Sequence, residues 1–427
     1  MDGYRHRIMD VLLKKKLEAK GAVLIEGPKW CGKTTTAEQI AVSKVMLART
    51  DVKNNFRSLL EIDTDAALAG APPMLIDEWQ TVPKLWDAVR YTVDQRRKMG
   101  QFILTGSSVP DKDAEQEIEH SGTGRFAWLT MRPMSLFESG ESNGSVSLGD
   151  LFVTSKNILG KNSLLLKDIA FLICRGGWPM AIDLPEEAAL EQAFDYYDAV
   201  TKEDITKVNG IKRASEKVQR LMRAYARHQG TQASIATLKE DLKSNDMGTI
   251  DDDTIASYLD ALRKIFVVED MPAWNPNLRS KTAIRTTDTR YFVDPSIATA
   301  ALGIGPADLI NDLNTMGFLF ETMCVRDLRV YAEALNGKVY HFRDKKGLEC
   351  DAVIHLRNGQ YGLIEIKLGG ETLINDGVET LNSLENQIDT IQMKAPAFKM
   401  ILTATGDYAY RRPNDGIYIV PVGCLKP

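Results

Sequence analysis

The sequence predicts an α/β protein whose first domain is built on a parallel sheet. Residues 22–41 have the pattern of a strand, a tight glycine loop and a helix, and two further apolar runs, 74–78 and 101–108, end in acidic or small polar residues. Strand and helix patterns alternate again from residue 315 onwards. Such alternation is typical of sheets covered by helices, and a chain of 427 residues exceeds what one hydrophobic core usually supports. We therefore expect separate domains at 1–205, 206–300 and 301–427.

The glycine loop reads Gly-Pro-Lys-Trp-Cys-Gly-Lys-Thr at residues 27–34 and lies between the apolar run 22–25 and a helical pattern. A loop of this kind between a strand and a helix holds a polyphosphate through its backbone N–H groups and the positive end of the helix. Lys33 is expected to reach the β- and γ-phosphates, and Thr34 to offer its hydroxyl to Mg²⁺. The alternative is a Gly-Lys-Thr that only caps a helix. The expected nucleotide contacts are Gly27, Pro28, Lys29, Trp30, Cys31, Gly32, Lys33, Thr34, Thr35 and Thr105.

A second half of the site is expected at Met74-Leu75-Ile76-Asp77-Glu78, some forty residues downstream. An acid at the end of a neighbouring buried strand can hold the Mg²⁺ shell and orient water. Asp77 would act through Mg²⁺, and Glu78 would be the base that polarises the attacking water. The alternative is an ordinary strand that ends in an acidic turn.

The third apolar run ends in Thr105-Gly106-Ser107-Ser108, and a hydroxyl at the carboxyl end of a parallel strand faces the nucleotide crevice. Thr105, Ser107 and Ser108 are all candidates for sensing the γ-phosphate, and the pattern does not choose between them. A charge-stabilising arginine is expected after this strand, in cis or in trans between subunits. Arg125 is the first choice and Arg132 and Arg175 are rivals, while a surface arginine without a catalytic role is the alternative for each.

Composition limits the class of protein. No apolar run approaches membrane-spanning length and no signal-peptide pattern follows the N-terminus, so we expect a cytoplasmic protein without a membrane partner. The five cysteines are scattered and form no Cys-x-x-Cys pair, which argues against a disulfide framework or a zinc site. The net charge is −5, so any nucleic-acid binding has to come from a local basic surface.

These motifs, together with Gly-Arg-Phe at 124–126, Arg-Pro-Met-Ser at 132–135 and Arg-Gly-Gly-Trp-Pro at 175–179, resemble the prokaryotic AAA-type ATPases that are fused to a C-terminal domain of unknown function. The resemblance covers essentially the whole chain. It implies hydrolysis of ATP with Mg²⁺ and a ring-type homo-oligomer, for which a hexamer is one form. The helical patterns at 151–172 and 186–204 fit a helical lid over the nucleotide.

The middle segment, 212–294, has the order of a winged helix-turn-helix: three helices, a strand, a basic loop and a second strand. Basic residues at three- and four-residue spacing would line one stripe of its first helix, and others lie in the loop. A phosphate-contacting surface and a solvated basic face or subunit contact are both open interpretations. The candidate DNA contacts are Arg213, Lys217, Arg220, Arg223, Arg227, Arg279, Lys281 and Arg285.

The C-terminal segment contains Asp351 and then Glu365-Ile366-Lys367 across a hairpin, an arrangement that resembles the PD-(D/E)xK restriction-endonuclease superfamily. In that superfamily two carboxylates hold Mg²⁺ and the lysine activates water. A three-residue loop with Gly359 in a left-handed conformation would place Asp351 opposite Glu365. Glu321 falls on the apolar stripe of a preceding helix and would join this metal site. The alternative is a structural ion pair in a degenerate nuclease fold that only binds.

Two functions from different classes follow from these patterns. The first is an ATP-driven enzyme that binds and remodels or processes DNA, including branched or damaged duplex of the kind met in repair or recombination. The second is a nucleotide-controlled switch or interaction protein, in which the C-terminal domains contact a partner and hydrolysis resets the state.

Overall fold

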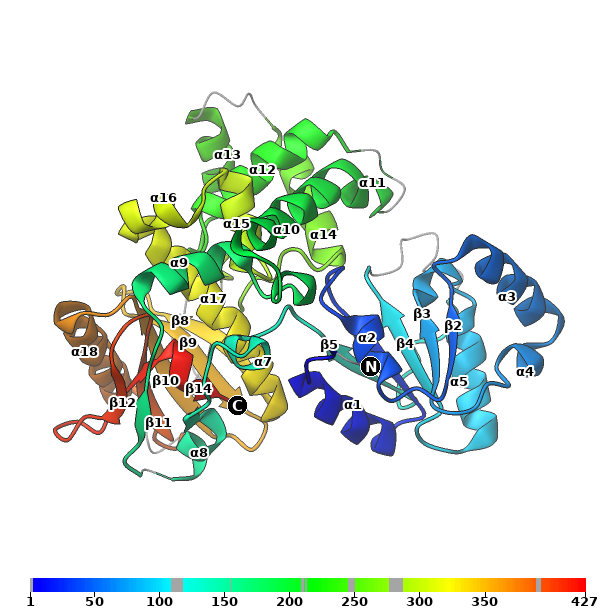
Figure 1. Cartoon of the computed structure of the whole chain (residues 1–427), viewed down its shortest axis with the longest axis horizontal. Coiled ribbons are helices and arrows are strands. Elements are labelled where there is room, and N and C mark those ends of the chain that lie inside the picture. Colours follow the sequence, from blue (N-terminus) through cyan, green and yellow to red (C-terminus); the bar gives the residue numbers. More distant parts are fainter. Residues whose placement is uncertain are drawn as a thin grey trace. The chain divides into compact units, whose positions relative to one another are not determined.

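The computed structural model describes residues 3–108, 118–154, 156–208, 211, 213–244, 250–275, 287–388 and 393–427. The chain divides into two compact units (Figure 1). The first contains Met1–Pro133, Lys202–Ala214 and Tyr258–Val267, and the second contains Met134–Thr201, Ser215–Ser257 and Val268–Pro427. This division differs from the expected boundaries at 205 and 300, because residues 134–201 belong to the second unit.

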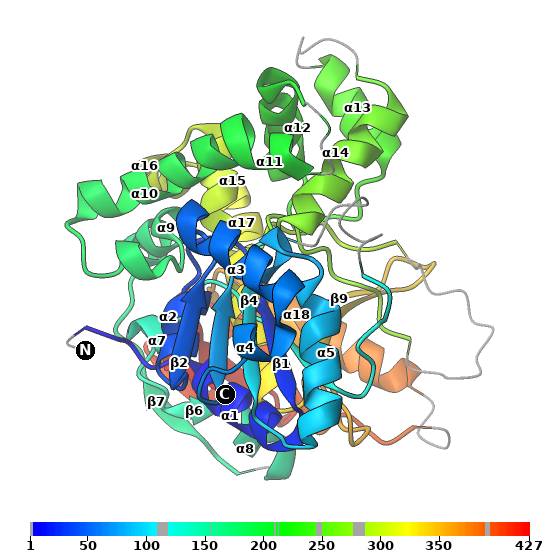
Figure 2. The same ribbon diagram turned by 90° about the vertical axis from the view of Figure 1, so that its right-hand side faces the viewer.

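The first unit is built on a five-stranded sheet with the order β2-β3-β4-β1-β5, in which every neighbouring pair is parallel. All its strands therefore end at the same edge, where loops can converge on a ligand. The parallel sheet predicted from the sequence is confirmed, and Figure 2 shows it with its flanking helices. The strands are β1 (Ala22–Glu26), β2 (Ser43–Met46), β3 (Met74–Asp77), β4 (Phe102–Gly106) and β5 (Phe126–Thr130).

Alternate residues of the central strands point into two cores. Leu24, Ile76 and Leu104 pack on one face with apolar residues of α3 and α5, and Val23, Leu75 and Ile103 pack on the other with residues of α1 and α2. Because both faces are covered, these strands are continuously apolar, which is why the sequence shows them so clearly. The helices of this unit are α1 (Ile8–Ala19), α2 (Lys33–Glu38), α3 (Thr50–Ile62), α4 (Thr64–Ala67), the 3-10 turn η1 (Trp79–Thr81) and α5 (Leu85–Arg96), and the segment from the middle of the chain adds α11 (Ile205–Lys207).

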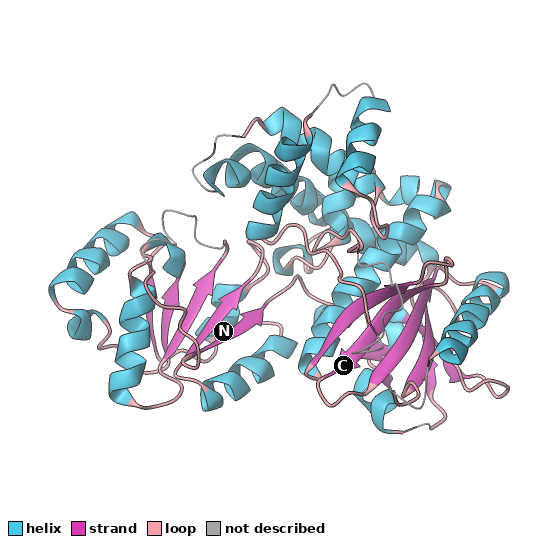
Figure 3. Ribbon diagram, turned by 180° about the vertical axis from the view of Figure 1, so that it is seen from behind, coloured by secondary structure: helices cyan, strands magenta, loops and turns pink. Residues whose placement is uncertain are grey.

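The second unit contains a seven-stranded mixed sheet with the order β7-β12-β13-β11-β10-β9-β8. Its strands are magenta in Figure 3. Strand β7 comes from residues 159–161, so a segment expected to be part of a lid forms the edge of the C-terminal sheet. A two-stranded sheet joins β6 to β14 near the C-terminus. The strands are β6 (Val146–Ser147), β7 (Leu159–Lys161), β8 (Gly337–Arg343), β9 (Glu349–Leu356), β10 (Tyr361–Lys367), β11 (Phe398–Thr403), β12 (Tyr408–Arg411), β13 (Tyr418–Pro421) and β14 (Leu425–Lys426).

The helices of 134–201 pack inside the second unit. α10 contacts α15, and α9 contacts α15, α16 and α17. The expected helix at 151–172 is wrong, because α8 ends at Val153 and β7 lies between it and α9. This packing does not support the expected helical lid over the nucleotide. The helices of residues 134–201 are α7 (Leu136–Ser139), α8 (Leu148–Val153), α9 (Leu166–Arg175) and α10 (Glu186–Ala199), and those of the C-terminal part are α15 (Pro295–Leu302), α16 (Pro306–Asn311), α17 (Leu313–Ala334) and α18 (Glu371–Gln387).

A buried ion cluster joins distant segments of the second unit. The Arg326 side chain is 1% exposed, and its Nη1 donates to Asp294 at 2.9 Å while Nε and Nη2 donate to Asp327 at 2.9 and 2.7 Å. The same two carboxylates accept from the backbone N–H groups of Gly177 and Leu136. Because a buried charge is costly unless it is paired, this cluster favours the observed placement of Leu136 and Gly177 beside Asp327 and Asp294.

The middle segment forms α12 (Ser215–Arg227), α13 (Ile235–Ser244) and α14 (Asp252–Lys264), followed by the antiparallel bridges Val268↔Phe292 and Met271↔Thr289. The expected order of three helices and two paired extended segments is therefore present. α14 crosses the division between the two units. The loop residues Arg279, Lys281 and Arg285 lie outside the described residues. Among the helices that the structure describes, no one is both long and apolar enough to span a membrane.

Candidate functional site

The phosphate loop runs from the end of β1 to the start of α2 at Lys33. Two of its glycines are required by geometry. Gly32 has a φ of 99°, and a Cβ at Gly27 would lie 2.0 Å from Met131 O. The loop also contains a non-glycine residue with positive φ, Trp30 at 66°, and such conformations cluster at functional sites. Together these features define a narrow backbone cradle at the N-terminus of a helix, as a polyphosphate requires.

Lys33 is buried beneath this loop. Its Nζ donates to Gly27 O at 2.9 Å and to Pro28 O at 2.7 Å, so the ammonium group points along the inner side of the loop. Charge-assisted bonds to phosphate oxygens are stronger than bonds to neutral carbonyls. The side chain is therefore placed to exchange these carbonyls for an anionic ligand.

Asp77 lies at the end of β3 and binds two hydroxyl groups. Thr34 Oγ1 donates to Asp77 Oδ1 at 2.6 Å, and Thr105 Oγ1 donates to the same oxygen at 2.7 Å. The parallel register of β3 and β4 pairs Asp77 with Thr105 directly. A hydroxyl and a carboxylate oxygen side by side are ligands that Mg²⁺ prefers, so Thr34 and Asp77 fit a magnesium ion bound with a nucleotide.

Glu78 follows with a φ of 57°, which turns the chain sharply out of the strand. Its Oε2 accepts from Ser107 Oγ at 3.0 Å and from Gln80 Nε2 at 2.5 Å. Thr105 and Ser107 therefore have different partners: the first orients Asp77 and the second contacts Glu78. The sequence singled out Ser107 but not Gln80, because nothing in an Asp-Glu-Trp-Gln run shows that the chain reverses at the glutamate.

The other residues expected to contact the nucleotide differ in their burial and in their hydrogen-bond partners. Cys31 is buried and donates to Met131 O at 3.4 Å, so its thiol braces the loop. Lys29 forms an ion pair with Asp204 at 2.6 Å, within the same unit, and Thr35 is an exposed residue of α2. Lys29, Trp30 and Thr35 stay predictions as nucleotide contacts.

Arg7 supports the loop from behind, which the sequence did not indicate. This buried residue lies directly before α1, and its guanidinium donates to Cys31 O at 2.7 Å and to Arg132 O at 2.8 Å. One cation thereby joins the phosphate loop to the segment that follows β5.

The arginine candidates lie in three different places. Arg125 precedes β5 and therefore lies at the edge of the sheet opposite the phosphate loop, where it pairs with Asp94 through Nε at 2.8 Å. Five strand residues separate that edge from the loop, roughly 16 Å at 3.3 Å per residue. A role for Arg125 within its own subunit is thus wrong, and only a role in trans stays a prediction. Arg132 follows β5 at the nucleotide edge, whereas Arg175 is buried in the second unit and pairs with Glu141 at 2.6 Å.

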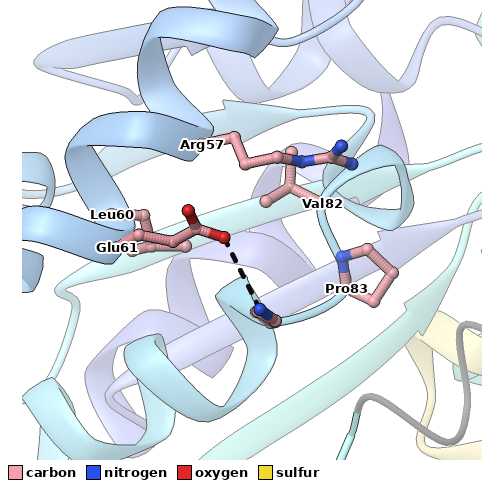
Figure 4. A pocket seen from close by; sticks show the side chains of 6 residues that line it. Arg57, Leu60, Glu61, Val82 and Pro83 are labelled. Atoms are coloured by element: carbon pink, nitrogen blue, oxygen red, sulfur yellow. Dashed lines mark ion pairs between the residues drawn. The ribbon is translucent and has the colours of Figure 1, made fainter.

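A small pocket of about 140 Å³ is lined by residues of α3 and by Val82, Pro83 and Lys84, which follow η1 (Figure 4). Arg57 Nη2 donates to Thr81 O at 3.2 Å, and Thr81 N in turn donates to Glu78 O at 3.1 Å. Glu61 and Lys84 pair with each other across the pocket at 3.5 Å. The contact of this pocket that matters for the site is the hydrogen bond from Arg57 of α3, which supports the turn at Thr81.

The second candidate site is a cluster in the C-terminal sheet. The register pairs Ile364 with Ala352, so Glu365 falls opposite Asp351, and Gly359 has a φ of 85°. The predicted hairpin is confirmed. Lys367 Nζ lies 3.2 Å from Asp351 and 2.7 Å from Glu365, and the Tyr291 hydroxyl donates to Glu321.

Burial raises the pKa of Glu365, and the nearby Asp351 charge adds to the effect. Burial and Asp351 likewise raise the pKa of Glu321. The second cause is that three carboxyl groups lie near one ammonium ion. Asp351 and Glu365 in turn raise the pKa of Lys367 despite its burial. The cluster thus favours a bound proton on a carboxyl group over a third negative charge.

This cluster predicts a pH-dependent stability. The folded state binds a proton at Glu365 more tightly than the unfolded state, so the stabilising contribution is complete below the ordinary pKa of 4.5 and is lost as the pH rises towards the raised value. Each pKa unit corresponds to about 1.4 kcal/mol. We expect Glu365→Gln to flatten the fall in Tm between pH 5 and 8, whereas Glu379→Gln, which changes an exposed carboxylate of α18, leaves it unchanged. An equal slope in the Glu365 variant would contradict the assignment.

The carboxylates that were expected to hold a nuclease metal ion are not arranged as metal ligands in the part of the chain that the structure describes. Among the described residues, no three His, Cys, Asp or Glu side chains are grouped so that they could hold a metal ion. Lys367 lies against Asp351 and Glu365, and the Glu321 carboxylate is bound by Tyr291. The geometry corresponds more closely to the alternative of a structural ion cluster, and the metal site stays a prediction.

The basic stripe is shorter than expected. Arg213 precedes α12 and is buried, with Nη1 donating to the carbonyls of Ile205 and Val208 at 3.0 and 2.8 Å, so its assignment as a DNA contact is wrong. Arg227 pairs with Asp241 on α13 at 2.6 Å, and Arg220 pairs with Glu216. Lys217 and Arg223 are exposed. The surface that remains for a phosphate backbone is Lys217, Arg220 and Arg223.

Three family models match separate parts of the chain. Residues 19–139 match a model described as an AAA domain, and residues 166–308 and 316–425 match two domains of unknown function, DUF8612 and DUF4143. The AAA match contains the phosphate loop, Asp77, Glu78 and Thr105, so it supports a nucleotide-binding ATPase domain. The unknown functions of the other two leave the rest of the chain without an assigned activity.

Two relatives and two solved structures are similar to this chain. Proteins Rv2008c of Mycobacterium tuberculosis and Mb2031c of Mycobacterium bovis are each 24% identical over 357 residues, which is 83% of this chain and 72% of the relative. A Walker-type ATPase of Pyrococcus abyssi is similar with a TM-score of 0.41 and 12% identity over 68% of this chain and 94% of its own. The replication initiator DnaA bound to AMPPCP and single-stranded DNA has a TM-score of 0.27 and 12% identity over 60% and 86%.

Proposed function

We propose that the protein hydrolyses ATP and uses the hydrolysis to bind and remodel or process DNA. The observation that carries the ATPase part is the convergence of Lys33, Thr34, Asp77 and Glu78 at one edge of a parallel sheet. The match to an AAA domain supports the same conclusion.

The residues of this chain have distinct roles in that reaction. The loop N–H groups and Lys33 bind the phosphates, and Thr34 and Asp77 hold Mg²⁺, which neutralises phosphate charge when bound. Thr105 fixes the orientation of Asp77 through the 2.7 Å bond to Oδ1. Glu78 is the base that takes a proton from water.

The DNA part rests on the exposed basic residues of α12, namely Lys217 and Arg223, and on the hairpin cluster, which belongs to the same unit. Phosphate contacts of this kind are not sequence-specific, and they weaken steeply with salt. The test is an ATPase assay with Mg²⁺ and single-stranded, duplex and branched DNA, followed on a gel. Stimulation by one DNA form and affinity that falls linearly with log salt concentration would support the proposal, and indifference to all three forms would refute it.

Cleavage of DNA is a separate step of the proposal, assigned to Asp351, Glu365 and Lys367. We expect Asp351→Ala to abolish any Mg²⁺-dependent cleavage. The Asp351 carboxylate is partly exposed, and it accepts hydrogen bonds from both Lys367 Nζ and the backbone N–H of Ile366. Glu379→Ala, an exposed acid of α18, is the matched control and keeps wild-type cleavage. Cleavage by the Asp351 variant would show that the activity comes from elsewhere.

The second candidate is a nucleotide-controlled switch or interaction protein, and the pairing of Lys367 with two carboxylates favours it, because a compensated cluster needs no metal ion. Here the nucleotide state would control association with a partner or with further copies in a ring-type homo-oligomer. Sedimentation with ADP and with a non-hydrolysable ATP analogue tests this. Analogue-dependent assembly without DNA affinity would support the switch, and the same mass and partners in both states would exclude it.

A further inference from the structure

Gln80 contacts the base of the proposed reaction directly. Its Nε2 donates to Glu78 Oε2 at 2.5 Å, and Ser107 Oγ donates to the same oxygen at 3.0 Å. Within the described part of the chain, no hydrogen bond is formed by the other carboxylate oxygen, Oε1. One oxygen of Glu78 is thus held by two donors while the second keeps its lone pairs for another group.

The backbone is arranged for this contact. In an extended strand, residues two apart have side chains on the same face but separated by about 6.6 Å along the chain. The left-handed φ of 57° at Glu78 and the 3-10 turn η1 reverse the chain, so that Gln80 folds back onto Glu78. A non-glycine residue in this conformation costs free energy and persists only when its surroundings fix it. Thr81 supplies that support, because its N–H and hydroxyl both donate to Glu78 O, at 3.1 and 2.9 Å.

The Glu78 carboxylate sets the orientation of the Gln80 amide. Its Oε1 is buried and has no hydrogen-bond partner among the described residues. Turning the amide over would place this oxygen against the glutamate carboxylate, which is repulsive, so the nitrogen faces Glu78. A Cβ at Gly106 would lie 3.1 Å from Gln80 Oε1 and 3.1 Å from Trp79 Nε1, so a glycine leaves the room that this orientation needs.

We propose that Gln80 is a positioning residue for hydrolysis, which holds Oε2 of Glu78 so that Oε1 faces the attacking water. This inference rests on the proposed ATPase function. Gln80 acts through Glu78 and is not itself required to touch the nucleotide. Its loss should therefore slow turnover without weakening ATP binding.

The test compares Gln80→Met, Gln80→Glu, Glu78→Gln and the double variant Glu78→Gln/Gln80→Met in the full chain. We expect Gln80→Met to lower kcat about 10- to 100-fold, a part of the 10²- to 10⁴-fold effect of a general base, with the Kd of a non-hydrolysable ATP analogue unchanged. Gln80→Glu should lower kcat further, because it places a second carboxylate beside the first. In the double variant the Gln80 change should cost nothing more, since the base on which it acts is already lost.

The matched control is Gln101→Met, the same change at a buried glutamine that directly precedes β4 and donates to Met99 O. It should keep kcat even if Tm falls. The positioning role would be overturned if kcat fell in proportion to Tm in both Gln80→Met and Gln101→Met. It would also be overturned if Gln80→Met lowered kcat by the same factor in the wild type and in the Glu78→Gln variant. An active wild type with an unaffected Gln80→Met overturns this role alone, whereas a wild type without turnover overturns the proposed ATPase function and the role with it.

Discussion

Lys33→Ala is expected to abolish ATP hydrolysis and to weaken ATP binding. The ammonium group lies at the inner side of the phosphate loop, 2.9 Å from Gly27 O and 2.7 Å from Pro28 O, and alanine removes the only lysine of the described loop that is buried there. Loss of one preorganised cation or donor at a developing charge typically lowers kcat about 10²- to 10³-fold. Release of phosphate from saturating ATP measures this effect, and titration with a labelled analogue measures binding.

Lys44→Ala is the matched control for this prediction. Lys44 is an exposed lysine of β2 whose ammonium pairs with Glu38 at 2.7 Å, so its loss changes the charge of the same unit equally. It should leave turnover and affinity at wild-type values. Normal turnover in the Lys33 variant would refute the assignment of the phosphate loop.

The nucleotide site was predictable because its signals are local. Strand, glycine loop and helix follow one another within 22–41, and the acid at Asp77 ends a continuously apolar run. In a parallel sheet the ends of such strands meet at one edge, so the meeting of Thr34, Asp77 and Thr105 follows from order along the chain. The hairpin that pairs Asp351 with Glu365 was predictable for a similar reason, since the loop with Gly359 fixes the register.

The parallel order of the strands also excludes Arg125 as an arginine that acts in its own subunit. A residue that precedes a parallel strand lies at the edge where strands begin, opposite the loops that follow them, and Arg125 comes directly before β5. Arg213 differs from its prediction for another reason. Its spacing fits the stripe of α12, but the helix begins at Ser215, so Arg213 lies outside the helical periodicity and turns inward to backbone carbonyls.

Other features depend on contacts between distant segments and have no local signal. Strand β7 has three residues and pairs with β12, about 250 positions later, so only the folded structure shows that residues 134–201 belong with the C-terminal sheet. The cluster of Arg326, Asp294 and Asp327 that holds them there is likewise non-local. The role of Gln80 depends on a reversal of the backbone, and the role of Arg7 depends on hydrogen bonds to main-chain oxygens. Neither feature produces a recognisable pattern of residue types in the sequence.

Glu78→Gln is expected to bind ATP with wild-type affinity but to stall hydrolysis. Glutamine keeps the size of the side chain and a carbonyl oxygen that can still accept from Ser107 and Gln80, so the left-handed turn at residue 78 should persist. What is lost is the ability to take a proton from water, which is worth about 10²- to 10⁴-fold in rate. Single-turnover hydrolysis and analogue binding, measured on the same preparation, separate the two effects.

Glu61→Gln serves as the control for Glu78→Gln, because it neutralises an exposed acid of α3 whose only ion pair in the described structure is to Lys84 at 3.5 Å. It should hydrolyse ATP at the wild-type rate. If Glu78→Gln also turned over normally, the base would have to be another group at this edge of the sheet. If it instead lost affinity for ATP, Glu78 would contribute to nucleotide binding. The assignment of Asp77 to the Mg²⁺ ion and of Glu78 to the attacking water would then be wrong.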